Sequence, residues 1–214
     1  MKNQMSHLLV SLTGVGIGLV CGANAEAQSA FTPPVLSEIT PADEPTGNDG
    51  MFFTPATAIS VTALGYVSAV AASGNLVGLY DVSTQDLLAS TTVTVASTPS
   101  GDFLYQAISP VLLTPGTEYA VVGLYTAGSG DLGYLAPSGV GADPAINFVG
   151  YSYDLNTSLD LPTTSYLPAI FGPNFQFAPV PEPGSCGLMS AGLACAYGFF
   201  RSKADKKPKN SKSP

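Results

Sequence analysis

Carboxylates are the only side chains in the long central part of this sequence that combine acid–base character with the ability to bind metal ions. The single histidine, His7, lies close to the N-terminus, and the three cysteines, Cys21, Cys186 and Cys195, lie in apolar segments near the two ends. Between the first two cysteines no residue can act as an imidazole base or a thiolate. Ser-His-Asp and Cys-His catalysis, zinc sites built from His or Cys, and a disulfide within this region are therefore excluded.

The densest group of oxygen ligands lies in a short stretch ahead of the first strongly apolar run. Pro41-Ala42-Asp43-Glu44 is followed by Asn48-Asp49-Gly50, and oxygen ligands carried on loops are what Ca²⁺ binds. Asp43, Glu44 and Asp49 are therefore the calcium candidates, and calcium is the only cofactor that the sequence leaves open. The spacing departs from that of an EF-hand loop, so an ordinary acidic surface loop is the other interpretation.

Catalysis or sugar binding would have to use the remaining polar groups. A glycosidase needs two carboxylates facing each other across a cleft, and the scattered acidic residues favour no particular pair, so the sequence predicts that the protein is not an enzyme. The chain lacks Trp, which leaves Tyr134, Tyr151 and Tyr153, near predicted loops or strand ends, as candidates for a sugar-binding face. Half-buried packing is the alternative for tyrosines on strands. Asn156-Thr157-Ser158 matches a glycosylation sequon and is interpreted as a turn.

The charge distribution narrows the choice of partners. The formal net charge is -8, and every Lys and Arg lies at an end of the chain, so that no basic residue occurs from Ala25 to Phe200. A domain without cations cannot neutralise phosphates. Nucleic acids and anionic membrane surfaces are therefore excluded as partners of this region, whereas cations and neutral polymers remain compatible with it.

The first 25 residues have the pattern of a secretory signal peptide. Lys2 precedes an apolar run from Leu8 to Cys21, and Ala23-Asn24-Ala25 supplies the small residues of a cleavage site. Ala25-Glu26-Ala27 offers a second cleavage site, and an uncleaved anchor helix is the alternative. The sequence predicts an exported protein.

The C-terminal end carries a second targeting pattern. Val180-Pro181-Glu182-Pro183 is followed by an apolar stretch from Gly184 to Phe200 and then by a basic cluster that begins at Arg201. As a helix the apolar stretch spans about 25 Å, which is sufficient to cross a membrane when basic side chains reach the interface. The basic flank predicts that the end of the tail stays in the cytoplasm. A plain stop-transfer anchor satisfies the same physical requirements.

This order of features closely resembles the PEP-CTERM sorting signal of bacteria, over residues 180 to 207. The resemblance implies that Pro181, Glu182, Pro183 and Arg201 belong to a sorting motif read by an exosortase-type membrane transpeptidase. It also implies a cell-surface or extracellular location in association with exopolysaccharide or biofilm. Cys186 and Cys195 within the apolar stretch, and the dilution of the basic cluster by other residues, depart from the usual pattern.

The region between the two tails has the pattern of an all-β domain, because short runs rich in Val, Ile, Thr, Tyr and Phe alternate with clusters of turn residues. Residues 103–111 and 119–125 are expected to form a hairpin-like pair through Leu113-Thr114-Pro115-Gly116-Thr117, whose Pro-Gly suits a type II turn. Pro168 and Pro173 predict that 165–177 is an edge or irregular strand. The other expected strands are 57–66, 76–82, 87–96 and 145–153.

The expected fold is an antiparallel two-sheet sandwich, jelly-roll-like, flanked by an N-terminal signal helix and a C-terminal transmembrane helix. Motifs such as Phe52-Phe53-Thr54-Pro55 and Leu113-Thr114-Pro115-Gly116-Thr117-Glu118-Tyr119 resemble a recurrent β-sandwich of bacterial exported proteins, similar to the DUF4082-like group, over residues 50 to 126. The expected divisions are a signal peptide at 1–25, an acidic linker or start of the ectodomain at 26–50, the ectodomain at 51–179, the sorting signal at 180–207 with its helix at 184–200, and a basic tail at 208–214.

Two functional classes follow from the sequence. The first is a non-enzymatic surface or matrix protein that is delivered by the sorting tail. The second is a surface module that binds carbohydrate or calcium.

Overall fold

The structure is a computed structural model, and it describes residues 27–32, 39–41, 46–67, 74–126, 132–136, 140–165 and 169–181. All of them belong to one compact unit, Ala25–Pro183. Within these ranges every regular element is a strand and every sheet is antiparallel, which confirms the all-β prediction. The two predicted terminal helices fall on residues that lie outside the described ranges. No helix long and apolar enough to cross a membrane is found among the described residues.

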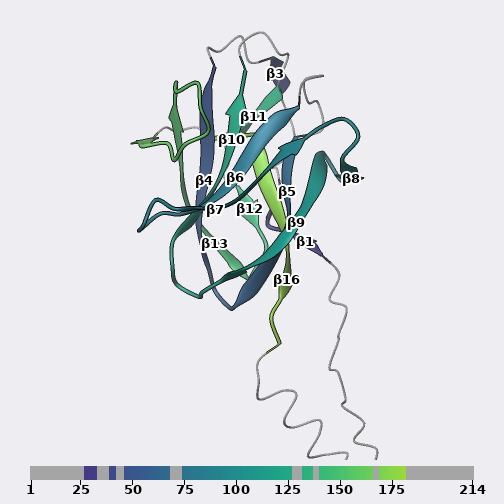
Figure 1. Ribbon diagram of the computed structural model, residues 1–214, viewed down its shortest axis with the longest axis vertical. Coiled ribbons are helices and arrows are strands. Elements are labelled where there is room, and N and C mark those ends of the chain that lie inside the picture. The colour runs from purple at the N-terminus through teal and green to yellow at the C-terminus, as the bar shows by residue number, and fades with distance from the viewer. Residues whose placement is uncertain are drawn as a thin grey trace, which may run out of the picture. The chain divides into compact units, whose positions relative to one another are not determined.

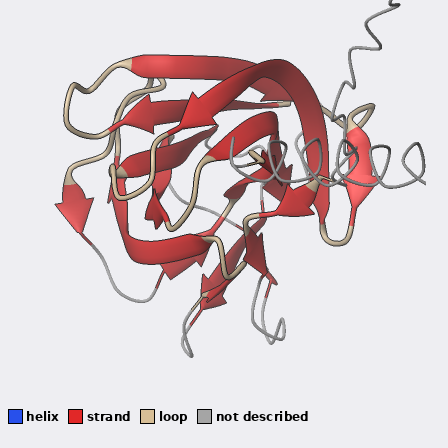
Figure 2. Ribbon diagram, turned by 90° about the horizontal axis from the view of Figure 1, so that it is seen from below, coloured by secondary structure: helices blue, strands red, loops and turns tan. Residues whose placement is uncertain are grey.

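Two larger sheets contain most of the strands (Figures 1 and 2). The five-stranded sheet has the order β1 (Gln28–Ser29), β16 (Pro173–Pro179), β5 (Ile59–Val67), β9 (Phe103–Leu113) and β8 (Thr98–Ser100). The six-stranded sheet has the order β14 (Thr164–Ser165), β13 (Ile146–Asp154), β4 (Gly47–Pro55), β10 (Tyr119–Tyr125), β6 (Asn75–Asp81) and β7 (Leu87–Val93).

Two smaller sheets complete the described strands. One has the order β15 (Ala169–Phe171), β11 (Leu132–Ala136) and β3 (Ile39–Pro41), and the other pairs β12 (Gly141–Ala142) with β2 (Phe31–Thr32). Strands therefore begin well before residue 51, because β1, β2, β3 and the first half of β4 all lie within 26–50, the stretch expected to be a linker or the start of the ectodomain.

Aromatic side chains from both larger sheets meet in one core. Phe53 of β4 and Phe175 of β16 are fully buried, and their ring centroids are 4.7 Å apart. Phe31 of β2 meets both rings edge-on, with centroids 6.0 Å from Phe53 and 5.8 Å from Phe175. Burying a side chain of this size contributes about 1.5–3 kcal/mol, so these contacts stabilise the packing of one sheet on the other.

Strand β5 follows the predicted alternation only in its first half. Ile59, Val61 and Ala63 are buried while Ser60 and Thr62 are half-buried, as the pattern of the sequence indicates. A register irregularity between Val61 and Ala63 interrupts the pairing with β9, and every residue after it is buried. A bulge shifts which residues face which side, so the period of two does not continue through it.

The turn at residues 114–117 has the predicted conformation but a different role. Gly116 has a φ of 75°, and the amide of Thr117 donates to the carbonyl of Thr114 at 3.3 Å, as in a type II turn. The prediction of a hairpin is wrong, because β9 and β10 belong to different sheets. The amide of Gly116 donates instead to the carbonyl of Pro55, at the end of β4, at 2.9 Å. The turn carries the chain from one sheet to the other.

Strand β16 lies inside its sheet, between β5 and the two-residue β1, and is not an edge strand. Pro173 is its first residue, where a missing N–H is tolerated, and Pro168 lies outside the described residues. The predicted irregularity is present as a register shift between Gln176 and Phe177. The placement of β16 brings Phe175 and Phe177 into the core.

Candidate functional site

The sorting motif lies at the boundary of the described residues. Pro181 follows β16 and is exposed, whereas Glu182, Pro183 and Arg201 lie outside the described ranges. Strand β16 ends at Pro179, two residues before the motif.

Asp49 is the calcium candidate that the described residues include. Asp43 and Glu44 lie outside the described residues, and the loop expected at Asn48-Asp49-Gly50 is part of strand β4. Asp49 is only 4% exposed, and the hydroxyl of Tyr151 donates to its carboxylate. The described ranges hold no group of three or more His, Cys, Asp or Glu side chains that could bind a metal ion.

Two of the three tyrosine candidates, Tyr151 and Tyr153, are part of the packing rather than of an exposed aromatic face. Tyr151 is 4% exposed, and burial, followed by the charge of Asp49, raises the pKa of its phenol far above the ordinary value. Tyr153 is half-buried against the core, and Tyr134 lies on β11. The alternative interpretation of packing on strands therefore describes Tyr151 and Tyr153.

A polar cluster that the sequence analysis did not assemble lies on the opposite face of β4. It consists of Asn48, Asp154, Asn156, Ser158 and Asp160, and is called the Asn48 cluster below. The Asn48 side chain is fully buried. Its Nδ2 lies within hydrogen-bond distance of three acceptors, Asp154 Oδ1 at 2.9 Å, the Ser158 carbonyl at 2.9 Å and Asp160 Oδ1 at 2.8 Å.

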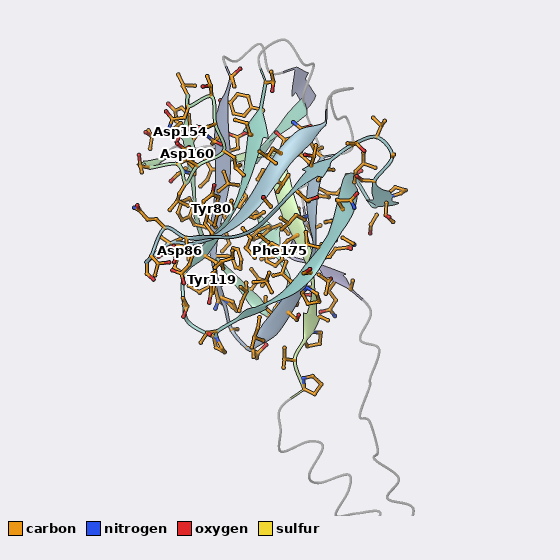
Figure 3. All side chains as sticks on the ribbon, viewed as in Figure 1. Tyr80, Asp86, Tyr119, Asp154, Asp160 and Phe175 are labelled. Atoms are coloured by element: carbon orange, nitrogen blue, oxygen red, sulfur yellow. The ribbon has the colours of Figure 1, made fainter. Side chains whose placement is uncertain are left out.

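The second amide of the cluster joins the same two carboxylates from the solvent side. Asn156 Nδ2 donates to Asp154 Oδ2 at 3.2 Å and to Asp160 Oδ2 at 2.7 Å. Figure 3 shows the labelled Asp154 and Asp160 close together at one side of the domain, away from Phe175 in the core. Two carboxylates are thus held around neutral amides.

The electrostatics of the cluster follow from this arrangement. Desolvation, and then the charge of Asp154, raise the pKa of Asp160, and the hydrogen bond from Asn156 opposes this shift only in part. Tyr80 of β6 faces the same group, since burial and then the charge of Asp160 raise the pKa of its phenol. The Tyr80 hydroxyl donates to the carbonyl of Leu159 at 3.2 Å.

The loop that carries the cluster crosses the outer face of the six-stranded sheet. Residues 155–163, called the strap below, join β13 to β14. Leu159 and Leu161 pack on Tyr80, Ala120 and Val122, which form an apolar cluster separate from the main core.

Glycines make room for the strap. Gly50, Val122 and Gly78 are cross-strand neighbours on β4, β10 and β6. A Cβ atom at Gly50 would lie 2.7 Å from Cγ of Pro162, and one at Gly78 would lie 2.9 Å from Cδ2 of Leu159. At Gly50 and Gly78 no side chain covers the backbone of the sheet, so the strap can approach it closely.

Chemically, the Asn48 cluster can hold and share protons. Its carboxylate and carbonyl oxygens are of the kind that Ca²⁺ takes, and each of them lies within hydrogen-bond distance of an amide nitrogen. A signal for the cluster was present in the sequence, because Asp154, Asn156, Ser158 and Asp160 follow one another at every second position. Asn156-Thr157-Ser158, interpreted from the sequence as a turn, lies outside the strands, and Thr157 and Ser158 form a bend.

Comparisons with known proteins add no relative. No protein-family model, curated protein or solved structure matches the chain. The resemblances described above therefore stay predictions from the sequence.

Proposed function

We propose that this protein is an exported, non-enzymatic component of the cell surface or extracellular matrix, delivered through a C-terminal PEP-CTERM signal and associated with exopolysaccharide or biofilm. An exosortase-type membrane transpeptidase would read the motif. The apolar stretch after the motif would hold the chain in the membrane at least until it is processed.

The observation that carries the proposal is the order of Pro181-Glu182-Pro183, the apolar stretch 184–200 and the basic cluster from Arg201. The extent of the β domain is compatible with it, because the described strands begin at Gln28, after the predicted signal peptide, and end at Pro179, before the motif. The absence of basic residues from Ala25 to Phe200 also suits a domain that works among neutral polymers rather than phosphates.

The proposal includes the finer description of the fold. We interpret the five-stranded and six-stranded sheets as the two layers of a jelly-roll-like sandwich, and the contacts of Phe31, Phe53 and Phe175 between them support this interpretation. Such a domain needs no catalytic group to act as a cohesive or adhesive unit.

The decisive experiment locates the mature C-terminus of the protein expressed in a bacterium with the transpeptidase and in a matched strain without it. Mass spectrometry is expected to find loss of the tail only where the transpeptidase is present. Replacing Pro181, Glu182 and Pro183 together by Ala should abolish this processing, whereas Pro179→Ala, two residues before the motif, should leave it intact. The proposal would be wrong if the tail were removed even without the motif, or if it were retained in both strains. The apolar stretch would then be interpreted as a plain membrane anchor.

The alternative is a module that binds carbohydrate or calcium, and two of its candidate residues, Asp49 and Tyr151, lose support. Asp49 and Tyr151 are bonded to each other and nearly inaccessible, so neither can contact an external ligand as placed. A glycan pull-down with the full chain tests the remaining possibility, with Tyr134→Ala and Tyr153→Ala as variants. Specific retention that these changes remove would favour the binding module over a purely cohesive role.

A further inference from the structure

The strap covers an apolar surface that would otherwise face solvent. The row Gly50, Val122 and Gly78 lies next to a second cross-strand row formed by Phe52, Ala120 and Tyr80. Phe52 is half-buried, and Tyr80, Ala120 and Val122 are buried, with Leu159 and Leu161 of the strap packed against this group. Lifting the strap would expose these side chains, so whatever holds the strap down controls access to this face of the sheet.

The base of the strap is fixed by one buried amide. Asp154, the last residue of β13, is the cross-strand neighbour of Asn48, and Asp160 lies in the second half of the strap. An amide NH₂ has only two N–H groups, yet the Asn48 nitrogen has three acceptors within hydrogen-bond distance. The backbone amide of Asp160 also reaches Asn48 Oδ1 at 3.4 Å. The contact between strap and strand is thus rich in acceptors and short of donors.

Protonation of one carboxylate supplies the missing donor. When Asp160 takes a proton from solvent, its hydroxyl can donate to the carboxylate of Asp154, and the repulsion between the two negative charges disappears. When both groups are ionised, neither can donate and they repel each other. No Lys, Arg or His occurs from Ala25 to Phe200, so no cation of this domain can compensate.

The groups that face the pair from neighbouring elements do not change this argument. Tyr80 on β6 adds no charge near neutral pH, because burial, and then the charge of Asp160, raise the pKa of its phenol above the ordinary value of 10.0. Asn48 on β4 and Asn156 on the strap do not titrate, and β10 contributes Ala120 and Val122 to this face. Asp154 on β13 is the only other carboxylate bonded within the cluster.

We propose that residues 155–163 form a proton-sensitive strap that is held most tightly over the six-stranded sheet when Asp154 and Asp160 share a proton, and that loosens when both are ionised. The raised pKa of Asp160 agrees with the direction of this switch, because the folded state binds the proton more tightly than the unfolded chain does. Its contribution to stability is complete below the unfolded pKa and is lost as the pH rises through the folded pKa.

Hydrogen exchange of the full chain, followed by mass spectrometry, tests the proposal at about pH 3, below the ordinary pKa of a carboxyl group, and at about pH 8, with rates corrected for the intrinsic pH dependence of exchange. In the wild type, the protection of peptides covering 155–163 should fall several-fold at the higher pH, whereas peptides of β5 should not change. Asp160→Asn imitates the neutral carboxyl and should keep similar protection at both pH values. Asp102→Asn, at an exposed carboxylate in the turn between β8 and β9, should behave like the wild type.

Three outcomes would overturn the proposal. The first is equal protection of the strap at both pH values in the wild type, which can be judged even if Asp160→Asn does not fold. The second is a pH response that survives both in Asp160→Asn and in Asp154→Asn. Protection that rises only when calcium chloride is added, and equally at both pH values, would also overturn it, because a metal ion would then replace the proton.

Discussion

The buried pair of Asp49 and Tyr151 shows how the absence of cations shapes single residues. A buried carboxylate is usually compensated by a positive charge, but no basic residue occurs from Ala25 to Phe200. Asp49 instead accepts a hydrogen bond from the hydroxyl of Tyr151, beside Met51 and Phe53 on the core face of β4. The Tyr151 hydroxyl thus stabilises a buried carboxylate, as an Arg or Lys side chain does in other proteins.

Removing this hydroxyl is expected to be costly. Tyr151→Phe keeps the ring but leaves the carboxylate without this donor, so we expect a loss of about 1–3 kcal/mol in the free energy of unfolding. Urea denaturation followed by circular dichroism measures it. In the background of Asp49→Asn the same change should cost less, because a neutral amide is easier to bury than a carboxylate. An equal cost in both backgrounds would mean that Tyr151 acts only through packing.

A second tyrosine predicts how stability depends on alkaline pH. Burial is the main cause that raises the pKa of Tyr105 from 10.0 to about 12, against the opposing hydrogen bond with Ser29. The folded state therefore favours the neutral phenol. This contribution to stability, about 3 kcal/mol, is present below the unfolded pKa of 10.0 and is lost as the pH rises toward 12.

The measurement is a set of urea denaturation curves at neutral pH and at several values between 10 and 12. Tyr105→Phe should reduce the loss of stability across this window, while its own cost at neutral pH, from the lost bond to Ser29, appears as a constant offset. A loss of stability that is the same in the variant and the wild type would assign the alkaline sensitivity to other groups.

At the scale of elements, the packing of the strap depends on two glycines of the sheet, Gly50 and Gly78. Gly50→Ala places a methyl group against the ring of Pro162, which is part of a buried, rigid residue, so we expect a loss of about 1–3 kcal/mol and reduced hydrogen-exchange protection at 155–163. Gly150→Ala is the matched control on the neighbouring strand β13, since no atom lies within 4 Å of the added Cβ. It should be neutral or slightly stabilising. Similar effects of the two substitutions would show that the strap does not pack on the sheet in this way.

The contrast between strap and strands shows what the sequence can predict. Alternation in β5 and the Pro115-Gly116 turn are local properties, and both were predictable because they depend on neighbouring residues. The assignment of β9 and β10 to different sheets was not, because a type II turn reverses the chain without specifying which strands pair. Asn48-Asp49-Gly50 was expected in a loop because its composition is that of a turn. Pairing with β10 and β13 overrides this preference.

The candidate site shows the same limit. The residues of the Asn48 cluster come from β4 and, about a hundred positions later, from the end of β13 and the strap, and their meeting depends on the pairing of β4 with β13. The alternating polar residues 154–160 were visible, but their partner Asn48 carries no local signal. Long-range pairing is set by burial over the whole domain rather than by any short motif.

At the scale of the whole molecule, the described domain is a polyanion held together by packing. Its exposed or partly exposed carboxylates lie on many elements and have no basic side chain of the domain to pair with. Those among the described residues are Asp81, Asp86, Asp102, Glu118, Asp143, Asp154 and Asp160. Their mutual repulsion opposes the compact state. The packing of Phe53, Phe175 and their neighbours in the core has to contribute more free energy than this repulsion costs.

Ionic strength should therefore stabilise this protein. Repulsion between exposed charges is screened over a Debye length, which shortens from about 30 Å at 0.01 M salt to about 8 Å at 0.15 M, so the melting temperature should rise over this range. Differential scanning calorimetry in sodium and in potassium chloride measures the effect, and the two salts should agree because screening is not specific to the ion. Asp86→Asn combined with Asp102→Asn removes two exposed charges and should reduce the dependence on salt. A melting temperature that falls with salt would contradict this prediction, because screening of a repulsion between like charges can only favour the compact state.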